Sequence, residues 1–90
     1  MVRVECRVSG LVQGVFFRAY AKEKAAERGV CGAAKNLPDG SVEIVAEGER
    51  AAVKDFLKDL REGPPGARVN NLSVVWKEAT RDFVDFRILP

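Results

Sequence analysis

The sequence contains no histidine, and this absence excludes several common kinds of catalytic site. Without imidazole there is no Ser-His-Asp or Cys-His machinery, and the usual nitrogen and sulfur ligand sets for structural zinc cannot be completed. Cysteine is also scarce, because only Cys6 and Cys31 are present and they lack the CxxC spacing. Both lie in apolar, strand-like runs, so we expect two buried, reduced thiols. Any catalysis must use a simpler set of groups.

Long apolar runs and a strong net charge are missing as well. No stretch approaches the roughly 20 apolar residues that cross a bilayer, and the first residues alternate polar and apolar, unlike a signal peptide. Fifteen basic and 13 acidic residues give a net charge of +2, with no polybasic tail. We therefore expect a cytoplasmic protein with no membrane partner and no nucleic-acid partner. A local anion site remains open.

Five segments have the composition or alternation of strands. With 90 residues, of which 47% are hydrophobic, we expect one compact domain over residues 1–90. The first segment alternates strictly, which places Val2, Val4, Cys6 and Val8 on one face. In the last segment Val84, Phe86 and Ile88 are in phase. The expected strands are residues 2–8, 30–36, 41–47, 69–77 and 83–89.

Two segments have the spacing of amphipathic helices. Residues 17–28 are rich in alanine, lysine and glutamate and end at Gly29, which favours a left-handed cap. The second helix lies before the stop at Gly63, Pro64 and Pro65. The order is βαββαβ, with the last strand split or doubled. It predicts a ferredoxin-like α/β sandwich, an α+β fold with an antiparallel sheet of four to five strands and two helices on one face.

The segment between the first strand and the first helix, residues 9–16, is the strongest candidate for an anion site. Gly10 and Gly14 interrupt it, and the helix start that follows leaves several backbone N–H groups without partners. Such groups bind anions. On composition alone, however, the two glycines are explained as turn formers. Neither the Walker pattern nor the dinucleotide pattern is matched.

Arg18 and Asn36 each have two explanations when the residues are taken alone. A cation in the first helical turn opposes the helix dipole by about 0.3–1 kcal/mol, unless an anion lies between it and the amides. A guanidinium with converging N–H groups makes a phosphate cradle, but a solvated surface arginine is an equally good explanation. Asparagine beside a turn usually makes local backbone hydrogen bonds. Its carboxamide can also accept a hydrogen bond from water and donate one to a phosphoryl oxygen.

Four segments together resemble the acylphosphatase family over nearly the whole chain. Residues 10–18 form the most specific of the four segments. The resemblance implies a ferredoxin-like fold. The sequence departs from the family pattern at Ala33, where the family usually has an aromatic residue. We expect the ring of Phe16 or Tyr20 to compensate for the missing aromatic side chain. The segments are Gly10-x-Val12-Gln13-Gly14-Val15-x-Phe17-Arg18, then Gly32-x-x-Lys35-Asn36-x-x-Asp39-Gly40-x-Val42-Glu43, then Gly48, and finally Gly63-Pro64 with Ala67-x-Val69.

The resemblance implies hydrolysis of the carboxyl–phosphate bond of small acyl phosphates to a carboxylate and inorganic phosphate. No metal and no cofactor is implied. Arg18 is expected to hold the phosphate oxygens and Asn36 to orient the attacking water. We expect a monomer whose partners are a small-molecule acyl phosphate and inorganic phosphate. The loop amides that assist Arg18 belong to Gln13, Gly14, Val15, Phe16 and Phe17.

The alternative is a non-catalytic or weakly catalytic anion-binding module, because ferredoxin-like domains serve many functions. An RNA reader of this topology needs stacking aromatics on its first and third strands, and residues 2–8 and 41–47 contain none. A metal chaperone needs paired cysteines in the first loop, which are absent. A phosphate-binding domain with or without hydrolytic activity is what remains.

Overall fold

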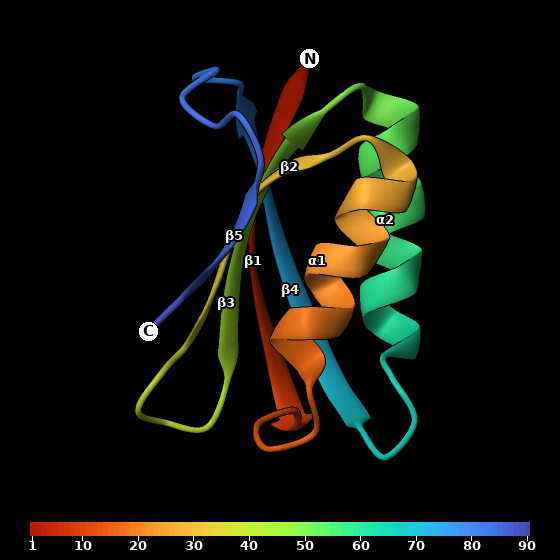
Figure 1. Cartoon of the computed structure of the whole chain (residues 1–90), viewed down its shortest axis with the longest axis vertical. Helices are drawn as coiled ribbons and strands as arrows, with labels where there is room; N and C mark the ends of the chain where they lie inside the picture. The colour runs from red at the N-terminus through yellow and green to blue at the C-terminus, as the bar shows by residue number, and fades with distance from the viewer.

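Two helices cover one face of a five-stranded sheet in the computed structural model, which describes residues 1–90 (Figure 1). The sheet order is β4-β1-β3-β2-β5. This arrangement confirms the expected ferredoxin-like α+β fold with a doubled last strand. Neither helix is long and apolar enough to cross a membrane. In chain order the elements are β1 (Val2–Leu11), α1 (Phe17–Arg28), β2 (Cys31–Asn36), β3 (Val42–Gly48), α2 (Arg50–Glu62), β4 (Arg68–Glu78) and β5 (Phe86–Leu89).

The sheet departs from the expected antiparallel pattern at its last strand. β1 lies between β3 and β4 and is antiparallel to both, and β2 is antiparallel to β3. β5 instead runs parallel to β2, with Phe86 opposite Gly32. The reason is geometric: β4 ends and β5 begins at the same end of the sheet, so β5 runs opposite to β4 and therefore parallel to β2.

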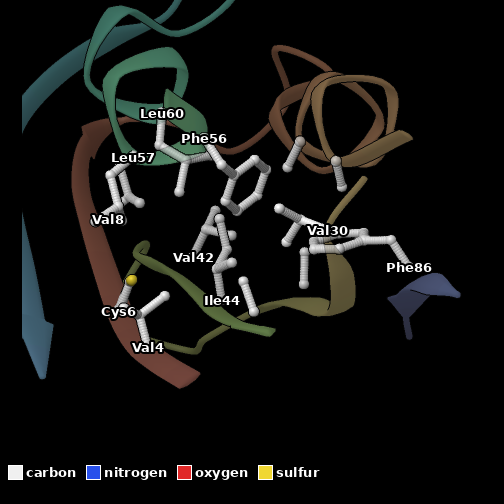
Figure 2. Packing of buried hydrophobic residues seen from close by; sticks show 14 of the residues in the cluster. Val4, Cys6, Val8, Val30, Val42, Ile44, Phe56, Leu57, Leu60 and Phe86 are labelled. Carbon is white, nitrogen blue, oxygen red and sulfur yellow. The ribbon is translucent and has the colours of Figure 1, made fainter. Parts of the chain in front are cut away.

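The core lies between the helices and the sheet, where apolar side chains from both layers meet (Figure 2). The alternation in β1 is confirmed, since Val4, Cys6 and Val8 are buried on the helix side. Rings from the two layers also meet, with the Phe56 and Phe86 centroids 5.8 Å apart. The other buried members that the helical and strand periods predict are Phe17, Ala21, Ala25, Val42, Ile44, Ala46, Val53, Leu57 and Leu60.

Two strand boundaries were wrong by more than one residue. β1 continues through residues 9–11, which were expected to be loop, because a bulge between Ser9 and Gly10 keeps the pairing with β4. Gly10 has φ +126°, and a side chain there would meet the carbonyl oxygen of Arg68. β5 begins at Phe86 rather than at residue 83, and Val84, expected to be in phase with Phe86, is 88% exposed whereas Phe86 is buried. Residues 79–85 connect β4 to β5, and their one backbone hydrogen bond to a strand is the one that the Asp85 carbonyl accepts from the Gly32 amide at 2.9 Å.

The expectation of two buried thiols holds for only one cysteine. Cys6 is buried in the core, and this burial raises the pKa of its thiol to about 12. Cys31 is only partly buried, because it begins β2 on the strand next to the sheet edge. Both thiols are free.

Glu47 on β3 is a buried carboxylate that holds the crossing segment in place. It accepts hydrogen bonds from Nη1 of Arg3 at 2.9 Å and from the amide and the hydroxyl of Thr80, both at 2.9 Å. The amide of Arg81 donates at 2.8 Å. Burial alone would raise the pKa of Glu47, but these donors outweigh it and hold the pKa at about 2. The carboxylate thereby fixes the path from β4 to β5 (Figure 1).

The Glu47→Gln variant should be less stable than the wild type at pH 7 by about 2 kcal/mol, because a carboxamide leaves buried donors without acceptors. The pKa of Glu47 is lower in the folded chain than its ordinary value of 4.5. Its stabilisation is therefore complete above that value and is lost as the pH falls toward 2. Urea unfolding at several pH values should show the gap between the two proteins closing over that interval. Glu43→Gln, on an exposed position of the same strand, is the control; an equal loss in both variants would contradict this role.

Candidate active site

A pocket of about 380 Å³ is lined by residues of the β1–α1 loop and the start of α1, together with Asn36 and Ile88. The β1–α1 loop and the β2–β3 hairpin lie at the same end of the molecule (Figure 1). Among the predicted site residues, only Val15 is absent from its lining, because the Val15 side chain packs against the core. The structure therefore brings Arg18 and Asn36, which are far apart in sequence, to one cavity. Its lining residues are Val12, Gln13, Gly14, Phe16, Phe17, Arg18, Ala19, Asn36 and Ile88.

The amides of residues 13–19 have no backbone acceptor. Nine backbone hydrogen bonds lie outside the helices and strands, and the first amide to donate after the loop is that of Tyr20, to the carbonyl of Phe16 at 3.0 Å. No side chain caps the start of α1, and its first turn has no acidic residue. The partial positive charge of the helix start is therefore unopposed by any group of α1 itself.

The backbone of the loop is bent into left-handed conformations. Gly14 has φ +74° and Phe16 has φ +61°. Glycine takes this conformation freely, whereas an aromatic residue does so at a cost of about 1–2 kcal/mol. Turns of this kind make concavities of N–H groups that bind anions, and strain of this kind concentrates at functional sites. The conformation of Phe16 supports the predicted phosphate loop.

Arg18 lies in the first turn of α1 and is held by the last strand. Its Nη1 donates a hydrogen bond to the carbonyl oxygen of Leu89 at 2.7 Å. A guanidinium has five N–H donors, so this bond orients the group and leaves others for a ligand. The cation is therefore held at the helix start, where the helix dipole disfavours it, by a specific hydrogen bond to β5.

Gln13 has a role that the sequence did not indicate. Its Nε2 donates to the carbonyl oxygens of Leu37 at 2.8 Å and of Ser41 at 2.9 Å. The side chain therefore ties the loop to the β2–β3 hairpin, and the backbone amide is what Gln13 can offer to an anion. Asp39 holds the same hairpin by accepting from the Ser41 amide at 2.9 Å, and hydrogen bonding by Ser41 lowers the pKa of this carboxyl.

Asn36 is the last residue of β2, and the strand period determines which way it faces. Ala34 is fully buried on the helix side of the sheet, so Asn36, two residues later, lies on that side as well. There it is half-buried and lines the pocket. The carboxamide and the free amides of the loop consequently belong to one cavity.

No aromatic ring replaces the one missing at Ala33. Ala33 pairs with Val45 and lies on the sheet face opposite to Ala34, away from the helices. Phe16 is 83% exposed at the helix start, and Tyr20 donates from its hydroxyl to the Asp59 carbonyl at 2.8 Å. The expectation that one of these rings compensates was wrong, because both belong to the helix side of the sheet.

Comparison with known proteins identifies the family. The acylphosphatase family model matches residues 4–88. An acylphosphatase from Pyrobaculum arsenaticum is 50% identical over 91 residues, which cover 100% of this chain and 96% of that protein. One from Dehalococcoides mccartyi is 49% identical over 82 residues, 90% of each chain. The crystal structure of acylphosphatase from Bacillus subtilis superposes with a TM-score of 0.97 at 34% identity, covering 100% of both chains. The chain belongs to the acylphosphatase family of enzymes.

Proposed function

We propose that this chain hydrolyses small acyl phosphates in the pocket between the β1–α1 loop and Asn36. The observation that carries the proposal is that Arg18 and residues 13, 14, 16, 17 and 19, whose amides have no backbone acceptor, line one cavity. A phosphate group presents three oxygens to such donors, and charge-assisted hydrogen bonds to them are the strong kind. The partners are then a small-molecule acyl phosphate and its product, inorganic phosphate.

In the proposed reaction, Asn36 orients a water molecule for in-line attack on phosphorus. The new bond joins the water oxygen to phosphorus, and the bond from phosphorus to the acyl oxygen breaks. The carboxylate leaves with the electron pair, and a water proton passes to an oxygen of the phosphate group. Because a carboxylate is a good leaving group, positioning and charge stabilisation are sufficient, and a strong base is unnecessary.

The side chain of Gln13 joins the β1–α1 loop to the β2–β3 hairpin and so holds the two parts of the site together. Arg18 and the amides belong to the β1–α1 segment, whereas Asn36 belongs to the hairpin that Gln13 contacts through Leu37 and Ser41. The expected monomeric state stays a prediction from the sequence. The cytoplasmic location stays a prediction from the sequence.

A phosphate-release assay with a chelator present tests the proposal. We expect release from benzoyl phosphate well above the spontaneous rate and none from p-nitrophenyl phosphate, because the monoester has a poorer leaving group for a site without a strong base. A reaction without protein gives the spontaneous rate. Binding of phosphate without any turnover of benzoyl phosphate would instead show an anion-binding module and would contradict the proposal.

A further inference from the structure

A row of cations without acidic partners lies along α2, beside the outer strand β4. The four cations recur at every fourth or third residue, so they share one side of the helix, and all are exposed. None of them takes part in an ion pair of the chain. They are Arg50, Lys54, Lys58 and Arg61. A hollow of about 280 Å³, the α2–β4 groove, is lined by Lys54, Leu57, Lys58, Arg61, Val74 and Trp76.

Trp76 is a large apolar side chain that this groove leaves 40% exposed. It pairs with the buried Val4 of β1, so it lies on the helix side of the sheet. The guanidinium of Arg50 lies over the Trp76 ring, 5.1 Å from its centroid. The ring also lines an adjoining hollow at the start of α2, so the groove continues past it. Tryptophan and arginine are the residues that most often dominate binding at protein interfaces.

The two walls of the groove differ in chemistry. The α2 wall presents Lys54, Lys58 and Arg61, whereas the β4 wall presents Val74 and Trp76. Successive side chains of an extended peptide point in opposite directions, so alternating acidic and apolar residues would each meet the complementary wall. The spacing also agrees. Residues four apart on a helix are separated by about 6 Å along its axis, and alternate residues of an extended chain by about 6.6–6.8 Å.

Other partners fit the groove less well. Proteins that bind single-stranded nucleic acid stack successive bases on several aromatic side chains, whereas Trp76 is the only aromatic residue that lines the groove. The Arg50 guanidinium also lies over its ring. In a two-fold symmetric contact with a second copy of the chain, the cations of the groove would face one another and repel.

We propose that the α2–β4 groove docks an extended acidic segment of a partner protein, in which carboxylates alternate with apolar residues. The carboxylates contact Lys54 and Lys58, and an apolar side chain packs on the Trp76 ring. No residue of the groove lines the active-site pocket, so the segment and a phosphate group bind at the same time. This docking site does not depend on the proposed hydrolytic activity.

The emission of Trp76, the only tryptophan of the chain, reports the contact directly. Titration with a short peptide in which glutamate and leucine alternate should give a saturable change. Glutamine in place of glutamate should raise the Kd about tenfold, and so should added salt, because both weaken the charge contacts. Saturating inorganic phosphate at matched ionic strength should leave the Kd unchanged. Displacement by phosphate would place the peptide in the active site and overturn the proposal.

A charge-reversal variant makes the test specific to the groove. Lys54→Glu/Lys58→Glu retains Trp76 as the reporter and should raise the Kd about tenfold or more, with an unchanged circular dichroism spectrum. Lys22→Glu/Lys24→Glu on α1 makes the same change of net charge away from the groove and should alter the Kd by less than about twofold.

Three results would contradict the docking site. The first is no saturable change in Trp76 emission with the alternating peptide. The second is equal weakening of binding in the two charge-reversal variants, which would show an effect of net charge alone. The third is tighter binding of oligouridylate or of phosphatidylserine vesicles than of the peptide, which would assign the groove to a different partner.

Discussion

The Arg18→Ala variant should lose about 10³-fold in kcat/KM for benzoyl phosphate, the usual scale for removing a cation that stabilises a phosphoryl group in transfer. Arg18 is the only charged residue that lines the pocket, so no neighbour can replace it. Phosphate binding should weaken in parallel, because the guanidinium contacts substrate and product alike. Initial rates and competitive inhibition by inorganic phosphate measure the two effects.

Two further variants separate the contact made by Arg18 from its charge. Lys22→Ala removes a cation from the next turn of α1, outside the pocket lining, and should change kcat/KM by less than about twofold, because exposed charges are well screened. Arg18→Lys retains the charge but loses the planar fork, so its activity should lie between those of the wild type and Arg18→Ala. Near-normal hydrolysis by folded Arg18→Ala would exclude the assigned phosphate loop.

Asn36→Ala should affect the other half of the site and give a different kinetic pattern. We expect kcat to fall on the order of 10²-fold, since a group that orients the nucleophile acts mainly in the transition state. The inhibition constant of inorganic phosphate should stay close to the wild-type value, because the loop and Arg18 are intact. Steady-state kinetics and phosphate inhibition on the same preparation distinguish kcat from binding.

Asn71→Ala, an exposed asparagine on β4, is the matched control for Asn36→Ala and should behave as the wild type. Asn36→Asp tests the need for a neutral group: a carboxylate beside the phosphate should weaken phosphate binding as well as turnover. If Asn36→Ala lost phosphate affinity as severely as Arg18→Ala, the division of roles between the two residues would be wrong.

The elements that the sequence predicts well are those with a strong local period. Residues 17–28 form α1 with the expected left-handed Gly29, whose φ is +70°, and Val53, Phe56 and Leu60 are buried as their spacing requires. These signals are local, because helix caps and apolar stripes depend on neighbours within one or two turns. The β1–α1 loop was located only in part, because residues 9–11 extend β1 through a pairing with β4 that is not local.

The features that could not be predicted depend on contacts between distant segments. In the sequence, Gln13 is only part of a loop motif. In the structure, its carboxamide donates hydrogen bonds to the carbonyl oxygens of Leu37 and Ser41 in the hairpin, 24 and 28 residues away. Ile88 reads as one more strand residue, and only the parallel pairing of β5 with β2 brings it to the pocket. In the sequence, Glu47 is only the end of an alternating strand. In the structure, the amides of residues 80 and 81 cover its carboxylate and donate hydrogen bonds to it. No local period encodes such contacts.

The central claim, that the loop amides and Arg18 together hold a phosphate group, is tested most directly by following the ¹H–¹⁵N NMR spectrum during titration with inorganic phosphate. We expect saturable shifts of the amides of residues 13–19 and of Arg18 Nε–H, with Thr80 and Arg81 at the far end of the sheet unmoved. Saturation should occur over the concentrations that inhibit hydrolysis. Amides of residues 13–19 that stay unshifted at those concentrations would contradict the assignment.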